Sequence, residues 1–549
     1  MGMMAETGLK ADGTAGPDQG ATRPWWQGAV IYQVYPRSFA DSNGDGIGDL
    51  RGLLAHLDHV ASLGADAIWI SPFFKSPMDD FGYDISDHCD IDPIFGTMAD
   101  CDAVIARAHE LGLKLIIDQV YSHTSIEHRW FQESRRDRAN PKADWYVWHD
   151  AKPDGTPPNN WQSVFGGPGW TWDARRRQYY MHNFLSSQPD LNLHNPEVQE
   201  AIKDVARFWM DRGVDGLRVD AANFFMHDRQ FRDNPINREA TAPKRPYEFQ
   251  SQIHNISQPE NLGFIEDLRR LLDSYPDRFM VAEMGEAPFD MVADYTLPGK
   301  RCHSAYNFSF LYHKRLDAGV PRRIIGGWNQ AAGGAWPSWT FSNHDAPRAL
   351  SRWGGDVPPP ALARCLNTLL VSLPGSVFLY YGEELGLPQA RVAFEDLVDP
   401  EAIANWPHTL GRDGARTPMP WAKDAPNGGF SSAKPWLPVD QRHLPLAVDV
   451  QSADPDSTLS VTRRLLARRR AEPALRWGDI RFRPPADPVL AFERTHAAGD
   501  LLVVVNLSGE TAAHGVGDSA DWVVAEAVNG ADLSGTTLPP YGALIARRG

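Results

Sequence analysis

The chain has 549 residues, of which 42% are hydrophobic and 23% are charged, and its formal net charge is −16. This composition excludes a disordered or fibrous chain and predicts a large core with at least one further domain. The negative charge argues against nucleic acid and against anionic membranes as partners. We expect a small neutral or cationic ligand, and a protein that is a monomer or a homodimer.

The first 24 residues lack the basic start and the apolar core of a secretion signal, and no run of about 18 apolar residues follows. We predict that 1–24 is a disordered tail. The four cysteines lack the spacing of metal ligands, which is typical of reduced thiols. They are Cys89, Cys101, Cys302 and Cys365. These features favour a cytoplasmic protein.

Segments of strand composition alternate with helical segments along most of the chain. Residues 50–64, for example, have the periodicity of an amphipathic helix that ends at Gly64. Eight such alternations predict a (β/α)₈ TIM barrel, whose functional residues lie at the carboxyl ends of the strands. The expected strands lie within 29–39, 65–74, 114–123, 214–225, 278–284, 304–310, 338–345 and 376–385.

Two interruptions break this alternation. Residues 124–178 are rich in Trp, Gly and Pro and are too long for a simple loop, so we expect an inserted subdomain over the mouth of the barrel. A shorter excursion, 232–250, follows the fourth strand. Short strands near the C-terminus predict a separate antiparallel β-domain. The expected domains are the barrel at 25–123 and 179–475, the inserted subdomain at 124–178 and the β-domain at 476–549.

The stretch "DGLRVDAANFF" places Arg218 and Asp220 two positions apart in the fourth strand. Residues at this spacing point to the same face of a strand, so both charges would enter the packed interior. A buried charge without a partner is costly. Either the two residues form a structural ion pair, or the arginine keeps a catalytic carboxylate ionised; ion-pair networks and active sites both perturb pKa values.

Polar residues also cluster at the ends of the third, fifth and seventh strands. Each cluster taken alone has an ordinary explanation, such as a helix cap or a satisfied core histidine. Together they would bring three carboxylates to one cavity, which is what cleavage of a glycosidic bond requires. The clusters are Asp118 with His123, Arg218 with Asp220, Glu283, and His344 with Asp345.

The segments "DQVYSH", "GLRVDAANF", "VAEM" and "FSNHD", in that order, resemble the four signature regions of the α-amylase family, glycoside hydrolase family 13. "QPDLN" resembles the fifth region in the α-glucosidase and oligo-1,6-glucosidase branch. "IYQVYPRSFADSNGDGIGDLRG", "DFGYDISD" and "ARTPMPW" are also patterns of that branch. "FFMHDRQFRDNP" together with "SQPENLGFI" is most similar to bacterial α-glucosidases that act on short substrates, and the resemblance covers nearly the whole chain from Trp25.

The resemblance implies three catalytic residues. Asp220 matches the nucleophile, and Arg218 is expected to lower its pKa. Glu283 matches the general acid and base, whose pKa nearby carboxylates are expected to raise. Asp345 matches the third carboxylate, which would hold two sugar hydroxyls.

The resemblance also implies a closed pocket for one glucose. His123 and His344 would donate hydrogen bonds to its hydroxyls, and Asp80 and Tyr83 would hold and stack on the ring. Arg416 matches a further arginine of the pocket. Closure by Asp80 and Arg416 would favour attack at the non-reducing end.

"DSNGDGIGD" carries oxygen ligands at alternating positions with glycines for the turn, and it resembles half of an EF-hand loop. This predicts a structural Ca²⁺ ion, with Mg²⁺ as the alternative. The ordinary alternative is an acidic turn without metal. The expected ligands are Asp41, Asn43, Asp45, the backbone of Ile47, and Asp49.

The implied function is that of an exo-acting, retaining α-glucosidase on disaccharides, with transglucosylation as a side activity. The alternative is a transglucosylase, or an isomerase that converts trehalose or sucrose. Ala221 leaves the linkage open, because the family has valine there with α-1,6 substrates and threonine with α-1,4 substrates. Ser122 replaces the usual asparagine of the first region, and 308–323 lacks the arginine-rich segment of isomaltulose synthases. Inactive relatives that serve as transporter subunits have lost the carboxylates, which this chain keeps.

Overall fold

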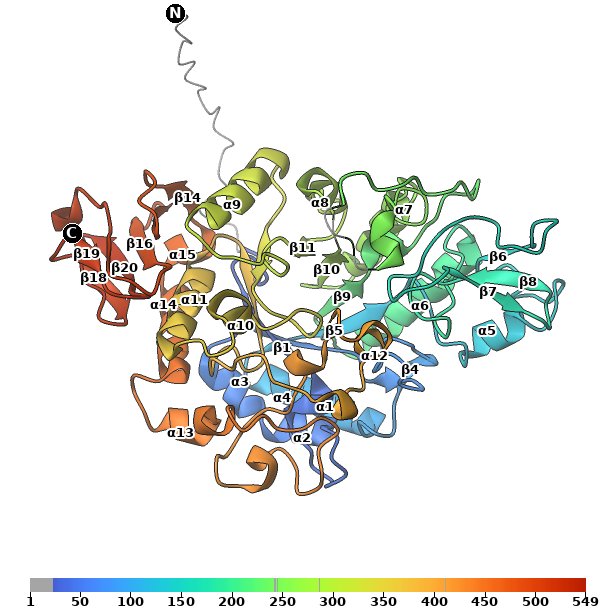
Figure 1. Cartoon of the computed structure of the whole chain (residues 1–549), viewed down its shortest axis with the longest axis horizontal. Helices are drawn as coiled ribbons and strands as arrows, with labels where there is room; N and C mark the ends of the chain where they lie inside the picture. The colour runs from blue at the N-terminus through green and yellow to red at the C-terminus, as the bar shows by residue number, and fades with distance from the viewer. Residues whose placement is uncertain (1–22, 241–242, 244, 286, 410) are drawn as a thin grey trace, which may run out of the picture.

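The computed structural model describes residues 23–240, 243, 245–285, 287–409 and 411–549. The predicted tail therefore lies outside the described residues, except for Arg23 and Pro24. A central barrel carries a small sheet on one side and a larger antiparallel sheet on the other (Figure 1). Within the described part of the chain, no helix is both long and apolar enough to cross a membrane. All four cysteines are free.

The barrel is an eight-stranded parallel sheet with the strand order β11-β10-β9-β5-β2-β1-β13-β12. Its two outer strands approach each other, since the hydroxyl of Ser304 in β11 donates a hydrogen bond of 2.9 Å to the carbonyl of Trp336, just before β12. All eight predicted strands form, which confirms the barrel. They are β1 (Val30–Val34), β2 (Ala67–Ile70), β5 (Lys114–Val120), β9 (Gly216–Asp220), β10 (Phe279–Met284), β11 (Ser304–Asn307), β12 (Ser338–Thr340) and β13 (Ser376–Tyr380).

The interior of the barrel changes from apolar to charged toward the carboxyl ends of the strands. Trp69 and Ile116 belong to a buried apolar cluster inside the barrel. Arg218 lies next to Asp118 in the register of β5 and β9, and its guanidinium carbon is 5.0 Å from the centroid of the Trp69 ring. The apolar layer thus supports a layer of charges directly below the barrel mouth.

Helices cover the outside of the barrel. The predicted helix at 50–64 is divided into α2 and α3, because His56 leaves the helical conformation (φ −114°, ψ 8°). It ends as expected at Gly64, in the left-handed conformation. The helices are α1 (Pro36–Phe39), α2 (Leu50–Ala55), α3 (Leu57–Leu63), α4 (Met98–Glu110), α5 (Arg129–Ser134), α6 (Pro196–Asp211), α7 (Asn261–Leu272), α8 (Phe289–Tyr295), α9 (Gly319–Ala331), α10 (Ala349–Gly354), α11 (Pro360–Ser372), α12 (Pro400–Asn405), α13 (Val448–Ser452), α14 (Thr458–Ala471) and α15 (Pro473–Trp477).

The segment between β5 and α6 forms a three-stranded antiparallel sheet with the order β6-β8-β7. Its last strand runs past the predicted boundary at 178, because β8 pairs with β7 as far as Met181 and Trp170. A two-stranded sheet of β3 and β4 lies between β2 and α4. The strands are β3 (Phe74–Lys75), β4 (Asp87–Ile91), β6 (Trp148–His149), β7 (Trp170–Asp173) and β8 (Gln178–Met181).

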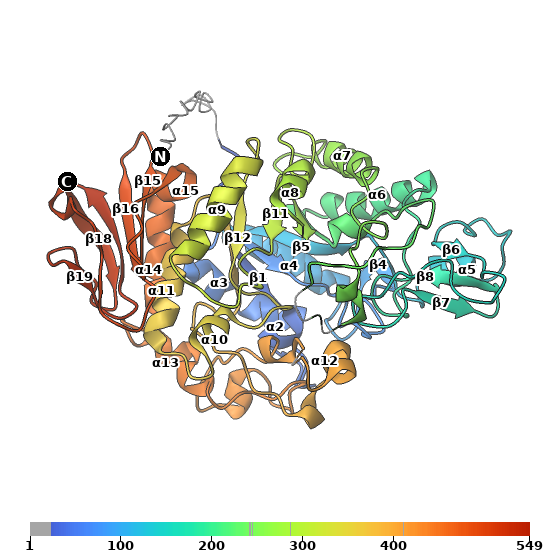
Figure 2. The same cartoon turned by 45° about the horizontal axis from the view of Figure 1, so that its top comes forward.

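The C-terminal sheet begins at Asp479 and has the order β14-β15-β16-β20-β18. Helices α11 and α14 lie between it and the barrel (Figure 2). The buried side chain of Arg494 donates hydrogen bonds to the carbonyls of Ser372 (2.7 Å) and Leu475 (3.0 Å), which joins the sheet to α11 and α15. The strands are β14 (Asp479–Phe482), β15 (Val489–Thr495), β16 (Leu501–Asn506), β17 (Ala512–Ala513), β18 (Trp522–Val528), β19 (Thr537–Leu538) and β20 (Ala543–Arg548).

Candidate active site

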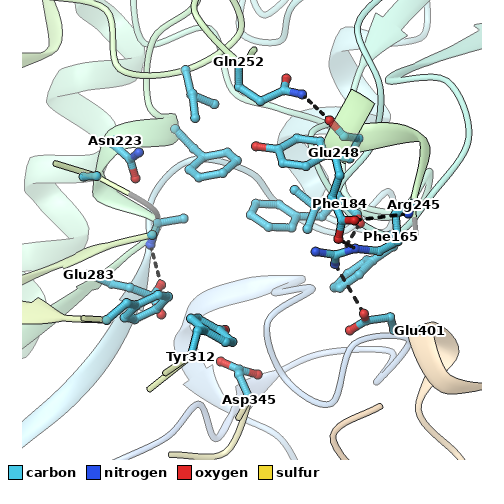
Figure 3. A pocket seen from close by; sticks show the side chains of 18 of the residues that line it. Phe165, Phe184, Asn223, Arg245, Glu248, Gln252, Glu283, Tyr312, Asp345 and Glu401 are labelled. Carbon is cyan, nitrogen blue, oxygen red and sulfur yellow. Dashed lines mark hydrogen bonds and ion pairs between the residues drawn. The ribbon is translucent and has the colours of Figure 1, made fainter. Parts of the chain in front are cut away.

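The carboxyl ends of the barrel strands open into a cavity of about 1180 Å³. Its walls come from four parts of the chain: the strand ends, the inserted subdomain, the excursion after β9, and the segment around α12. Figure 3 shows Glu283 and Asp345 facing the cavity, with Arg245 and Glu401 across from Glu283. The barrel mouth therefore carries the cavity that the sequence predicts.

Arg218 joins the charged strand ends into one network. Its Nη1 donates hydrogen bonds to Asp118 (2.8 Å) and Asp220 (2.6 Å), and its Nη2 pairs with Glu283. The guanidinium is fully buried. The arginine is thus both the structural partner of Asp118 and the neighbour of two carboxylates in the cavity wall. The ion pair is present, and the catalytic role of Asp220 stays a prediction.

A strained turn follows β9. Ala221 adopts the left-handed conformation (φ 42°, ψ 46°), which is uncommon for residues other than glycine. Its N–H donates a hydrogen bond of 2.9 Å to Oε2 of Glu283, the residue next to the end of β10. Strain of this kind persists only where the surrounding structure fixes it, and it is often found at functional sites.

Asp220 and Glu283 are buried together, and both carboxyl groups pair with the guanidinium of Arg218. Burial raises the pKa of Asp220 to about 7 although Arg218 lowers it. Burial also raises the pKa of Glu283 to about 8, and the charges of Asp220 and Asp345 add to this effect. The expectation that Asp220 has a lowered pKa is therefore wrong, because burial outweighs the guanidinium. The pKa of Glu283 is raised as expected, although burial contributes more to this than the nearby carboxylates do.

Asp345 lies on the turn after β12 and is ionised. Burial alone would raise the pKa of this carboxyl, but His344 and the guanidinium groups of Arg416 and Arg412 hold it well below its usual range. Arg416 donates to Oδ1 of Asp345 at 2.8 Å. The cavity thus combines one carboxylate that stays charged with two carboxyl groups that titrate near neutral pH.

Asp80 pairs with Arg412, at 2.8 Å. Arg412 also pairs with Asp399 at 2.8 Å, and all three side chains are buried. Arg416, in contrast, is fully buried and donates to the carbonyl of His344 (2.7 Å) and to Asp345. The prediction that Arg416 closes the pocket with Asp80 is wrong. Arg412 takes that place, and its signal was the first arginine in "GRDGARTPMPW".

Tyr83 and His344 pack face to face, with ring centroids 5.3 Å apart and planes at 4°. The Tyr83 hydroxyl lies 2.6 Å from Nε2 of His344 and donates to Asp118 at 3.0 Å. Nδ1 of His344 lies 2.9 Å from the amide nitrogen of Gln33. Both ring nitrogens of His344 thus have protein partners, which favours a role in holding Tyr83 and Asp345 over donation to a sugar.

His123 lines the cavity and is held on both sides of its ring. Its Nδ1 lies 2.8 Å from the hydroxyl of Ser122, and its Nε2 lies 3.0 Å from the carbonyl of Tyr83. Gln188 contacts the same Nε2 at 3.2 Å and donates to Asp80 at 3.1 Å. Ser122 therefore serves as a hydrogen-bond partner of His123.

Aromatic residues form the rest of the wall, and the sequence pointed to their segments but not to the side chains. Phe184 stacks on Phe224, with ring centroids 5.2 Å apart, and Arg412 lies over Phe165 at 5.0 Å. All three phenylalanines line the cavity. They give the part of the cavity beyond the carboxylates an apolar surface.

The acidic loop before α2 is ordered by its own hydrogen bonds. Asp41 accepts from the N–H groups of Asn43 (3.0 Å), Gly44 (2.7 Å) and Gly46 (2.8 Å). Asp49 caps α2 through the N–H of Gly52, at 2.7 Å. Among the residues that the structure describes, no group of three or more His, Cys, Asp or Glu residues could hold a metal ion. The expected ligands also include the side chain of Asn43 and the backbone carbonyl of Ile47, which do not belong to these four residue types. The finding therefore does not test the cation, which stays a prediction.

Residues 33–478 match the family model described as the catalytic domain of alpha amylase. The chain therefore belongs to the α-amylase family. It is 53% identical, over 499 residues, to a probable α-glucosidase of Rhizobium meliloti (strain 1021), covering 89% of this chain and 90% of that one. It is 37% identical to an oligo-1,6-glucosidase of Heyndrickxia coagulans, covering 89% and 93%.

Solved structures of similar fold agree with the assignment of the chain to the α-amylase family. An α-glucosyl transfer enzyme, XgtA, has a TM-score of 0.93 and 52% identity, over 96% of this chain and 100% of that one. The trehalulose synthase MutB of Pseudomonas mesoacidophila has a TM-score of 0.87 and 32% identity, over the same shares of the two chains. Relatives of this fold thus include hydrolases, a transfer enzyme and an isomerising synthase.

Proposed function

We propose that the chain is an exo-acting, retaining α-glucosidase that releases α-glucose from the non-reducing end of short α-glucosides. The observation that carries this proposal is the gathering of Asp220, Glu283 and Asp345 at one cavity, with the first two paired to the same arginine. The names of the relatives, α-glucosidase and oligo-1,6-glucosidase, support the same class.

In the first step, the carboxylate of Asp220 attacks the anomeric carbon while the protonated Glu283 donates its proton to the leaving oxygen. The glycosidic bond breaks, and a covalent glucosyl-enzyme forms. The raised pKa of Glu283, which burial causes and to which the charges of Asp220 and Asp345 add, supports its role as the acid that starts protonated.

In the second step, Glu283 takes a proton from water, the water oxygen attacks the anomeric carbon, and Asp220 leaves. Two inversions give α-glucose with retained configuration. An inverting enzyme would need its carboxyl groups about 6.5–9.5 Å apart to admit a water molecule between acid and base. One guanidinium, that of Arg218, pairs with both Asp220 and Glu283, and carboxyl groups held this close together favour retention instead.

The remaining residues would bind and position the sugar. The ionised Asp345 would accept hydrogen bonds from two hydroxyls, while His344, Arg416 and Arg218 hold the carboxylates in place. Asp80, with Tyr83 and His123, would bind the terminal glucose. The pair of Asp80 and Arg412 would close the pocket beyond this glucose, which supports attack from the non-reducing end.

Transfer of glucose to another sugar, or isomerisation of a disaccharide, is the second candidate. The apolar surface of Phe165, Phe184 and Phe224 supports it, because it would keep water away from the glucosyl-enzyme and leave the acceptor hydroxyl to attack. The comparison with the transfer enzyme and the synthase points the same way. Product analysis by NMR at high disaccharide concentration separates hydrolysis from transfer.

We also propose that the loop from Asp41 to Asp49 binds a structural Ca²⁺ or Mg²⁺ ion. Asp41, Asn43, Asp45, the carbonyl of Ile47 and Asp49 would supply the oxygens, as the alternation of ligands suggests. The four free cysteines support a reducing compartment such as the cytoplasm. Whether the protein is a monomer or a homodimer is measured by light scattering.

A panel of substrates tests the proposed function. We expect kcat/KM to be higher for one or more glucose disaccharides or sucrose than for maltotriose, and much higher than for soluble starch. Efficient depolymerisation of starch would contradict a closed pocket. The same panel identifies the linkage, which Ala221 leaves open.

A further inference from the structure

Arg245 ties together three walls of the cavity. Its Nε donates a hydrogen bond of 2.9 Å to Glu248, which belongs to the same excursion. Its Nη1 donates to Glu401 at 3.3 Å and contacts the carbonyl of Val164, in the inserted subdomain, at 3.5 Å. Figure 3 shows this side chain between Glu248 and Glu401, across the cavity from Glu283.

Glu401 is held in place by the same segment that carries Asp399 and Arg412. It lies in the first turn of α12, where its N–H donates to the capping residue Asp399 at 3.2 Å. Asp399 pairs with Arg412, and Arg412 pairs with Asp80. One short segment thus anchors two ion pairs. One joins Arg412 to Asp80, and the other joins Glu401 to Arg245 of the excursion.

The ion pair of Arg245 and Glu401 is partly shielded from water. The side chain of Arg245 is 22% exposed and that of Glu401 is 17% exposed. Both residues line the cavity. A shielded pair resists separation more than an exposed one does, because Glu401 would lose this partner without becoming fully hydrated, while Arg245 would keep Glu248. A chain of sugars that extends past the carboxylates would have to part it.

We propose that the ion pair of Arg245 and Glu401 is a specificity-determining strap that restricts efficient cleavage to disaccharides by blocking the site for a third sugar unit. This inference rests on the proposed function, and it names the residues that limit the length of the substrate. On this proposal, a disaccharide would end before the strap, and a trisaccharide would meet the strap with its third unit.

The test compares substrates that differ only in length. We would measure kcat/KM of the wild type, R245A, E401Q and R245A/E401A for maltose against maltotriose and for isomaltose against isomaltotriose. Because the strap blocks only the third unit, the ratio of trisaccharide to disaccharide should rise by about tenfold in the double variant, a usual scale for discrimination within a pocket. The rate on 4-nitrophenyl α-glucoside should change little, since this substrate ends before the strap.

R464A is the matched control. Arg464 pairs with Glu526 at 3.1 Å, between α14 and β18, far from the cavity wall. Its removal should leave the ratio unchanged. If the double variant does not fold, E401Q alone decides, because it keeps the shape of the side chain and removes only the charge.

Two failures can be told apart. A wild type that prefers disaccharides, together with variants whose ratio stays at the wild-type value, would overturn the strap and leave the proposed function standing. An equal loss of rate on both lengths would also overturn it, because the pair would then bind the first two sugar units. A wild type inactive on every glucoside would overturn both.

Discussion

The backbone N–H of Ala221 donates a hydrogen bond of 2.9 Å to Oε2 of Glu283, while Oε1 of the same carboxyl pairs with Arg218. Both contacts come from β9 or from the turn that directly follows it. The strand that carries Asp220 therefore also fixes the carboxyl group of Glu283. The two proposed catalytic groups, positioned by one strand end, would keep their relative geometry even if the surrounding loops moved.

Asp220→Asn should abolish nearly all turnover. The amide has the shape of the carboxylate but cannot form the covalent intermediate, so we expect kcat to fall by at least roughly a thousandfold. Thermal unfolding of the variant checks that the fold is intact. Near-normal rates in a folded variant would refute the assignment of the nucleophile.

Glu283→Gln should separate substrates by their leaving groups. A disaccharide needs protonation of its leaving oxygen, whereas 4-nitrophenol leaves without it. We therefore expect a far larger loss of kcat/KM on disaccharides than on 4-nitrophenyl α-glucoside. Equal losses on the two substrates would count against Glu283 as the acid.

The pH dependence of kcat/KM should be bell-shaped, with its optimum between the two raised pKa values. Catalysis requires Asp220 without its proton and Glu283 with it. Activity should therefore rise as pH passes the lower value, about 7, and fall as pH passes the higher value, about 8. Because the protonation of each group affects the other, the two apparent pKa values of the profile describe the pair and not one residue each. E283Q should lose the fall in activity at alkaline pH when it is measured on 4-nitrophenyl α-glucoside. If the variant keeps that fall, Glu283 is not the group that causes it.

Arg412→Ala should weaken both the fold and substrate binding. It leaves Asp80 and Asp399 buried without their shared cation, which is expected to cost about 3–5 kcal/mol of folding stability. We also expect kcat/KM for disaccharides to fall by more than tenfold. Arg391 is 65% exposed and reaches Asp356 only at 3.8 Å, so R391A is the control and should match the wild type. Activity of R412A at the wild-type level would show that Arg412 does not close the pocket.

A cation bound to the loop at Asp41–Asp49 should stabilise the native state by mass action. Added Ca²⁺ or Mg²⁺ should therefore raise the Tm of chelator-treated protein by a few degrees, with little effect on the initial rate. The shift should disappear in D45N, which removes one ligand charge. An immediate loss of rate on chelation, without a change in Tm, would contradict a structural site.

The barrel and the three carboxylates were predictable from the sequence because strand periodicity and strand ends are local properties. Arg218 with Asp220 shows this, since two residues on one face of a strand must share their surroundings. The partner of Asp80 was not predictable, because Arg412 and Arg416 lie on one irregular segment whose path only the packed structure fixes. The pKa of Asp220 depends on a balance between burial and charge, and residue order does not reveal that balance.

The configuration of the first sugar released tests the central claim most directly. We would follow the hydrolysis of a cleaved disaccharide by ¹H NMR, before mutarotation equilibrates the anomers. Attack by Asp220 followed by attack of water predicts α-glucose as the first product, and D220N should release none. Release of β-glucose first would show a single inversion, and it would contradict the covalent intermediate and the role of Asp220.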